Sequence, residues 1–271
     1  MSADAALISE VQALAEVAAV SIMAIYSRTF CVEQKADDSP VTEADLAANA
    51  VIVQGLAALT PEWPVLSEEG ESVPFDERQQ WRRYWLVDPL DGTREFIKGN
   101  GEFTINIALI DSGRPVLGVI HVPVTGECYF AAQGSGAYKQ VKGCAAQQIR
   151  TRDWKGGHIT IAGSRACHSD RFKALLGNFS ERHVLTLGSS LKSCYISEGR
   201  ADLYARLGPT GEWDTAAAQC ILEEAGGALT DLDLNPLRYN SKDSLLNPPF
   251  LAFGDGGHDW RNYLPAEMLL L

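Results

Sequence analysis

The first sixty residues contain two apolar patterns with helical spacing, separated by one polar break. Apolar side chains at intervals of three and four residues predict an amphipathic helix over residues 3–28. The next segment, CVEQKADDSPVTEAD, is polar and contains Pro40, which indicates a loop. Thr42 can cap a second helix, predicted over residues 43–59 with Asp45 in its first turn.

Short apolar runs replace the helical pattern between residues 65 and 140. A two-residue strand, Val65-Leu66, stops at an acidic turn that contains Glu68 and Glu69. Glycine and proline turns separate the later runs YWLV, FTINIALI, VLGVIHV and ECYFAA, which predicts strands, and a short helix can start at Thr93. The polar stretch 141–157 contains three glycines and predicts a seam between two halves of the chain.

The second half alternates between strand-like and helix-like segments. Strands are predicted over 158–163, 183–188 and 202–205 and near Ala228 and Phe250, and helices over 170–176, 191–198 and 214–225. Such alternation is typical of an α/β layer. We therefore expect an α/β fold with an N-terminal α+β half over residues 1–155 and a C-terminal α/β half over residues 156–271.

Composition narrows the classes of function. The chain has 271 residues and a formal net charge of -12, which argues against binding to a nucleic-acid polymer, because such binding needs a basic face. A small anionic substrate remains compatible, since bound cations can reverse the local field. The six cysteines are widely spaced without a CxxC motif, which predicts reduced thiols in the cytoplasm. No basic leader and no run of 18 apolar residues occur, so we expect no signal peptide and no integral membrane segment.

The stretch VDPLDGTREF places acids where predicted elements end. Asp88 ends a strand and Asp91 lies in the next turn, while Glu68 follows another strand and Asp214 begins a helix. Carboxylates that converge on one cleft repel unless cations bridge them, and oxygen ligands of this kind suit Mg²⁺. The Leu90 carbonyl, freed by the turn, offers another oxygen. Two such ions can clamp the attacking water and the leaving oxygen of a phosphate ester.

Gly92 and Thr93 supply groups that a phosphate needs. Gly92 lets backbone N–H groups approach a phosphate, and the Thr93 hydroxyl can orient a water molecule. An ordinary structural turn remains the alternative interpretation of DxxDGT on its own.

The wider set of motifs resembles the inositol monophosphatase superfamily, and most closely its bacterial CysQ branch of 3'(2'),5'-bisphosphate nucleotidases. The motifs that carry this resemblance are SPVTEAD, VLSEE, YWLVDPLDGTREFIKGNGEFTINIALI, GSSLKSCYISEGRADLY and WDTAA. They cover most of residues 35 to 220. The resemblance implies a layered α-β-α-β-α sandwich of the type found in inositol monophosphatases and sugar phosphatases.

The resemblance also implies site residues. Two or three Mg²⁺ ions would bind to Glu68, Asp88, the Leu90 carbonyl, Asp91 and Asp214, with Asp45 near a weaker third ion. Thr93, with Glu68 and Asp45, would activate the water, and Gly92 and Thr93 would hold the scissile phosphate. The remaining substrate contacts would come from Ser164, Arg165, His168, Ser189, Lys192, Arg206 and Asp214.

The substrate implied by the resemblance is adenosine 3',5'-bisphosphate, hydrolysed to AMP and phosphate, with 3'-phosphoadenylyl sulfate as a second substrate. Inositol monophosphatase or sugar bisphosphatase activity is the alternative at the same metal centre, and a nucleotide-binding regulatory protein is the non-enzymatic one. Lys192 as a surface lysine and Arg206 as a salt-bridge partner are the structural alternatives for these cations. The expected location is the cytoplasm, with peripheral attachment to the inner membrane left open and the oligomeric state undetermined.

Overall fold

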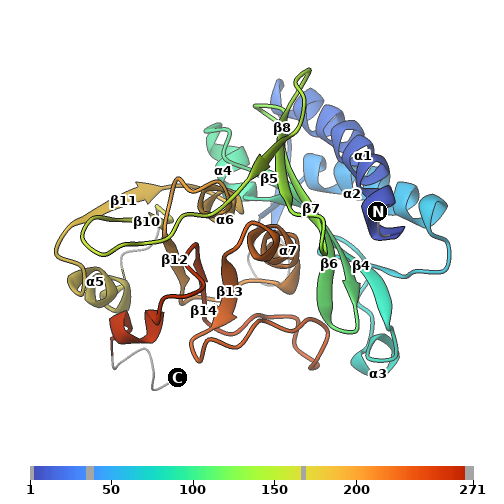
Figure 1. Ribbon diagram of the computed structural model, residues 1–271. Helices are drawn as coiled ribbons and strands as arrows, with labels where there is room; N and C mark the ends of the chain where they lie inside the picture. The colour runs from blue at the N-terminus through green and yellow to red at the C-terminus, as the bar shows by residue number, and fades with distance from the viewer. Residues whose placement is uncertain (1–2, 35–39, 166–168, 266–271) are drawn as a thin grey trace.

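The computed structural model describes residues 3–34, 40–165 and 169–265 (Figure 1). These residues form five layers in the order helix, sheet, helix, sheet, helix, which confirms the predicted α/β sandwich. Two helices, α1 (Ala3–Tyr26) and α2 (Glu43–Leu59), form the first layer. Their apolar sides pack on one face of a seven-stranded sheet in a core of buried aliphatic and aromatic side chains.

The seven-stranded sheet contains its strands in chain order, and the apolar runs of the sequence located most of them. In order across the sheet, the strands are β3 (Val65–Ser67), β4 (Arg83–Asp91), β5 (Thr104–Asp111), β6 (Arg114–Val122), β7 (Glu127–Ala132), β8 (Ala137–Val141) and β9 (Gln147–Ile149). β3 and β4 are parallel, and every later neighbouring pair is antiparallel. Short turns suffice for such antiparallel pairs.

The middle layer consists of α6 (Leu191–Ser197) and α7 (Ala216–Glu224), between the two sheets. The second sheet has the strand order β11 (Arg182–Thr186), β10 (Ile159–Gly163), β12 (Leu203–Arg206), β14 (Phe250–Phe253) and β13 (Ala228–Asp231). Helix α5 (Asp170–Gly177) packs on its outer face. The remaining short elements are β1 (Val32–Gln34), β2 (Pro40–Thr42), α3 (Phe75–Arg78), α4 (Thr93–Lys98), η1 (Glu212–Asp214) and η2 (Trp260–Tyr263).

Three local predictions were wrong. The polar segment before α2 contains the paired strands β1 and β2 instead of only a loop. Strand β9 lies within the stretch 141–157 that was expected to be a polar seam, because its partner β8 supplies backbone hydrogen bonds that need no apolar pattern. Strand β4 continues through Pro89 to Asp91, where the sequence indicated a turn.

The two predicted halves share one core. Buried residues of the larger sheet, of α6 and α7 and of the smaller sheet belong to a single apolar cluster. The proposed division near residue 155 falls between β9 and β10, in the connection that joins the two sheets. The division into two halves at residue 155 therefore stays a prediction. The shared apolar cluster means that the stability of one half depends on the other.

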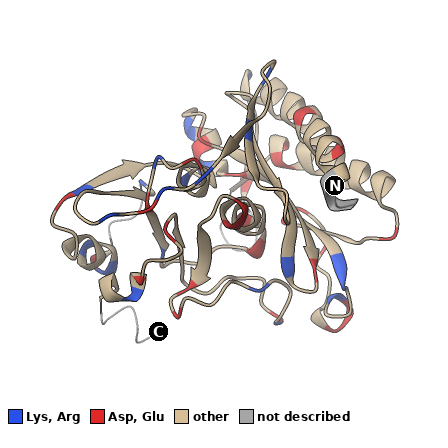
Figure 2. Cartoon of the chain, viewed as in Figure 1, with Lys and Arg blue, Asp and Glu red and all other residues tan. Residues whose placement is uncertain are grey.

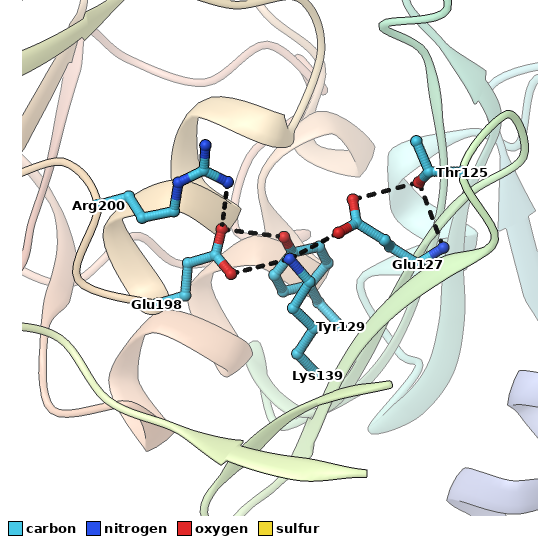
Figure 3. Close-up of polar contacts among 6 residues, drawn as sticks. All are labelled: Thr125, Glu127, Tyr129, Lys139, Glu198 and Arg200. Atoms are coloured by element: carbon cyan, nitrogen blue, oxygen red, sulfur yellow. Dashed lines mark hydrogen bonds and ion pairs between the residues drawn. The ribbon is translucent and has the colours of Figure 1, made fainter. Parts of the chain in front are cut away.

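A partly buried ionic network also connects the middle layer to the larger sheet (Figure 3). Lys139 of β8 lies between Glu127 of β7, at 2.7 Å, and Glu198 at the end of α6, at 2.9 Å. The Tyr129 hydroxyl and the Arg200 guanidinium donate to the same Glu198 oxygen, at 3.2 and 3.1 Å. These contacts fix the C-terminal end of α6 against β7 and β8.

Helix α1 is more apolar than the sequence analysis allowed for. Its segment from Ala6 to Tyr26 is long and apolar enough to cross a membrane by length and composition, contrary to the expectation that no segment is. Four of its apolar residues are fully buried on the sheet, namely Val11, Ala15, Ala18 and Ile22. Packing in the first layer therefore accounts for much of this composition.

Gly118 of β6 marks a close approach of the middle layer to the larger sheet. A Cβ atom at this position would lie 2.5 Å from the Ala217 carbonyl oxygen of α7. We expect Gly118→Ala to lower the free energy of unfolding by about 1–3 kcal/mol, because backbone atoms cannot move aside cheaply. Urea unfolding measures this change. Gly177→Ala is the matched control, since no heavy atom lies within 4 Å of its Cβ; equal destabilisation by both would contradict the packing argument.

Candidate active site

Three carboxylates from separate parts of the chain meet between the two sheets. Glu68, Asp88 and Asp214 each offer an oxygen, and these oxygens lie within 4.8 Å of one another. Glu68 directly follows β3, where its N–H donates to the Val87 carbonyl of β4 at 3.1 Å. Asp214 was expected to begin a helix and instead ends η1, just before α7. The parallel pairing of β3 with β4 therefore brings Glu68 beside Asp88, and the middle layer adds Asp214.

A β-bulge in β4 turns Asp91 toward the same place. Residues three apart in a regular strand point to opposite faces, but the register shifts between Asp88, which pairs with Asn106, and Asp91, which pairs with Thr104. One extra residue in β4 thus restores both acids to one face. The Leu90 N–H donates to Asp88 Oδ1 at 3.0 Å and holds the bulge.

Asp91 is oriented by polar neighbours from both halves. The Ser190 hydroxyl lies 2.8 Å from Asp91 Oδ2 and 3.0 Å from the Asp214 carbonyl oxygen. Asn106 Nδ2 lies 3.0 Å from that hydroxyl and 3.4 Å from Asp91 Oδ2. Ser190 stands at the start of α6, so the middle layer positions Asp91 as well as contributing Asp214.

When all the carboxylates of this cluster are charged, their desolvation and mutual repulsion destabilise the folded protein. Burial raises the pKa of Asp88 well above its usual range, and the charges of Glu68, Asp91 and Asp214 raise it further. The pKa of Asp214 is raised well above its usual range for the same reasons. Acidic and basic positions are interspersed along both halves (Figure 2), so the convergence of their oxygens, not local acidic composition, distinguishes these acids. Carboxylate oxygens gathered in this way fit hard divalent cations.

Asp45 connects a helix cap to Thr93. Its Oδ2 accepts hydrogen bonds from the Thr42 N–H at 2.8 Å and the Thr42 hydroxyl at 2.6 Å, forming a capping box at the start of α2. Its Oδ1 accepts from the Thr93 hydroxyl at 3.1 Å. Burial raises the pKa of Asp45, and these hydrogen bonds oppose the rise. The capping role and a role beside Thr93 are therefore compatible.

A cavity of about 250 Å³ opens beside the acids. It is lined by eight of the predicted site residues: Asp91, Gly92, Ser164, Arg165, Ser189, Lys192, Arg206 and Asp214. The predicted contact His168 lies outside the described residues. The structure thus gathers residues from both halves of the chain around one cavity next to the carboxylates.

Lys192 is not a surface lysine, and Arg206 does not form a salt bridge with any described residue. The Lys192 side chain is buried, its Nζ donates to the Ser189 carbonyl at 2.5 Å, and it lies 5.2 Å from the centre of the Tyr204 ring. Burial lowers its pKa. The interpretation of Lys192 as a surface lysine is therefore wrong. Arg206 donates to the Gly208 and Pro209 carbonyls at 3.3 and 2.9 Å, which leaves its charge without a carboxylate partner in the described part of the chain.

Some residues around the cavity were missed in the sequence analysis. Arg94 and Lys98, one helical turn apart on α4, line it from the side of the DGT turn. Their position on the short helix that begins at Thr93 was a usable signal. Ser190 and Asn106 carried no such signal, because their role depends on the pairing of β5 with the bulge and on the approach of α6.

Comparison with known proteins agrees with this geometry. The sequence profile described as the Inositol monophosphatase family matches residues 4–256. The 3'(2'),5'-bisphosphate nucleotidase CysQ of Escherichia coli (strain K12) is 48% identical over 247 residues, which are 90% of this chain and 98% of that protein. The CysQ of Haemophilus influenzae is 38% identical over 94% of this chain and 96% of its own length.

Solved structures show the same fold. The crystal structure of CysQ from Bacteroides thetaiotaomicron, described as a bacterial member of the inositol monophosphatase family, has a TM-score of 0.80. It is 36% identical, and the similarity covers 95% of this chain and 99% of that one. A Thermotoga maritima inositol monophosphatase, 27% identical, has a TM-score of 0.78 over 96% of both chains. The chain belongs to the inositol monophosphatase family.

Proposed function

We propose that the chain is a 3'(2'),5'-bisphosphate nucleotidase that removes the 3'-phosphate of adenosine 3',5'-bisphosphate and yields AMP and phosphate. The observation that carries this proposal is the cavity that joins Asp91 and Asp214 to a group of cations that includes Arg165, Lys192 and Arg206. A bisphosphate needs both features, because one phosphate reacts at the acids and the other needs positive charge. The relatives that are named 3'(2'),5'-bisphosphate nucleotidases support the same substrate.

Two or three Mg²⁺ ions would be held by Glu68, Asp88, the Leu90 carbonyl, Asp91 and Asp214, with Asp45 near the third. The donor set supports this choice, since Mg²⁺ prefers carboxylate and carbonyl oxygens. When bound, the ions supply positive charge that neutralises the phosphate and favours loss of a proton from the attacking water.

The chain's own residues position the reactants. Hydrolysis adds water to phosphorus and breaks the bond to the 3' oxygen, so the water loses one proton and the leaving oxygen gains one. The Thr93 hydroxyl donates to Asp45 Oδ1, and its oxygen lone pairs can therefore accept a hydrogen bond from the water. Glu68 would take up the proton of the water beside Thr93. Gly92, with a φ of 96°, turns the backbone so that α4 starts at the phosphate.

The distal part of the substrate would lie toward the second half of the chain. Lys192 offers a point charge and Arg206 and Arg165 offer planar guanidinium groups, which suit phosphate oxygens. Ser164 and Ser189 would add hydroxyl contacts. A sulfuryl group on the distal phosphate would keep its negative charge, so 3'-phosphoadenylyl sulfate is the proposed second substrate. A cytoplasmic location is proposed as well, in keeping with five described cysteines that form no disulfide.

Phosphate release tests the proposed reaction. We expect Mg²⁺-dependent hydrolysis of adenosine 3',5'-bisphosphate with kcat/KM at least about tenfold above that for inositol 1-phosphate, because an extra charged contact is worth that factor or more. EDTA should abolish both activities. A preference for inositol 1-phosphate would keep the metal centre and contradict the substrate, and absence of release from either would contradict both.

Thermal unfolding tests the carboxylate cluster without relying on turnover. We expect Asp88→Asn to stabilise the protein in EDTA by about 1–3 kcal/mol, because it removes one buried charge from a group of like charges. Mg²⁺ should raise the Tm of the wild type and raise that of Asp88→Asn much less. Asp153→Asn, at an exposed acid, is the control. Equal Mg²⁺ stabilisation of wild type and Asp88→Asn would contradict the assignment of Asp88 as a ligand.

A further inference from the structure

Glu102, between α4 and β5, forms a two-pronged contact with Arg165 at the edge of the cavity. Its Oε2 and Oε1 atoms accept hydrogen bonds from the two terminal nitrogens of the guanidinium at 2.5 and 2.7 Å. The same Oε2 accepts the Gly188 N–H at 2.7 Å. Arg165 and Gly188 both line the cavity, so one carboxylate holds two parts of its wall.

The backbone of Glu102 is fixed between the two turns that border the cavity. Its carbonyl oxygen would lie 3.2 Å from a Cβ at Gly92 and 2.6 Å from a Cβ at Gly188. These two glycines precede Thr93 and Ser189, which are proposed to contact the substrate. The backbone of Glu102 therefore packs closely against both turns.

The Arg165 contact has the geometry that a phosphate would use. A carboxylate and a phosphate both accept two parallel hydrogen bonds from one guanidinium group. Among the described residues that line the cavity, Lys192 and Arg206 direct hydrogen bonds to main-chain carbonyls, whereas Arg165 is held by a carboxylate. The hydrogen bonds from Arg165 lower the pKa of the Glu102 carboxyl, as expected for a carboxylate that this guanidinium stabilises.

The ion pair is open enough to exchange. The Arg165 side chain is 40% exposed and the Glu102 side chain 22%. Ion pairs with this exposure are weak, and a phosphate carries more negative charge than a carboxylate. A second phosphate that enters the cavity can therefore replace Glu102 as the partner of Arg165, while the Gly188 N–H continues to hold Glu102.

We propose that Glu102 determines specificity by competing with the distal phosphate of the substrate for the Arg165 guanidinium. The inference rests on the proposed function, since it requires a substrate with two phosphates. A nucleoside monophosphate leaves the Arg165–Glu102 pair intact. A bisphosphate must break this pair, so Glu102 weakens its binding and sets how strongly the enzyme distinguishes the two substrates.

The test compares KM for adenosine 3',5'-bisphosphate and adenosine 3'-monophosphate in wild type, Glu102→Gln, Arg165→Gln and the double variant. For a monophosphate that turns over too slowly, its KI as a competitive inhibitor replaces KM. Glutamine at 102 keeps an oxygen that can accept the Gly188 N–H. We expect Glu102→Gln to lower KM for the bisphosphate about two- to fivefold relative to the monophosphate, the range that exposed ion pairs provide.

Arg165→Gln should raise the ratio of the KM for the bisphosphate to the KM for the monophosphate. In the double variant, Glu102→Gln should cause no further change in this ratio. Asp233→Asn, which removes the exposed partner of Arg261, is the matched control and should leave both values unchanged. A purely structural role of Glu102 would instead lower kcat for both substrates equally or raise KM for the bisphosphate, and either result overturns the inference. An Arg165→Gln variant whose ratio of the two KM values equals that of the wild type would also overturn the inference. Failure of the wild type to hydrolyse the bisphosphate would overturn the proposed function itself, which separates the two outcomes.

Discussion

Repulsion among carboxylates that converge on the buried Asp88 is the constraint on which the rest of this structure depends. Glu68, Asp88 and Asp214 present oxygens within 4.8 Å of one another, and burial raises the pKa of Asp88 and of Asp214. Such a group opposes folding unless protons or cations neutralise it. The surrounding fold therefore has to supply enough apolar burial to hold the acids together, and the three-layered contact of sheet, helices and sheet does so in one continuous cluster. A site that costs stability in this way is typical of function.

The architecture explains how distant segments meet at these acids. The parallel pair of β3 and β4 delivers Glu68 and Asp88, and the bulge in β4 adds Asp91. The middle layer then contributes Asp214 before α7 and Ser190 at the start of α6. The ionic network around Lys139 holds the opposite end of α6 against the larger sheet (Figure 3). Each sheet alone would carry only part of the site, which is why its geometry depends on the shared core.

The sequence identified the residues that converge around the cavity better than it identified the strands that position them. Apolar periodicity located α1 and α2, and acids at the ends of apolar runs identified Asp88 and Asp91 as partners. The pattern DPLD predicts a turn, however, because proline and Asp-Gly are turn residues, whereas the structure accommodates Pro89 in a bulged strand. That bulge depends on the pairing with β5, which no local pattern reveals. The contact of Glu102 with Arg165 is likewise hidden, since 63 residues separate the two.

The metal assignment is the central claim, and anomalous scattering from crystals grown with Mn²⁺ in place of Mg²⁺ tests it most directly. Mn²⁺ accepts the same oxygen ligands and gives a signal that identifies its position. The account predicts at least two anomalous peaks among Glu68, Asp88, Asp91 and Asp214, with the Leu90 carbonyl as a ligand of one. Well-ordered crystals without a peak at these carboxylates, or with Mn²⁺ bound only elsewhere, would contradict it.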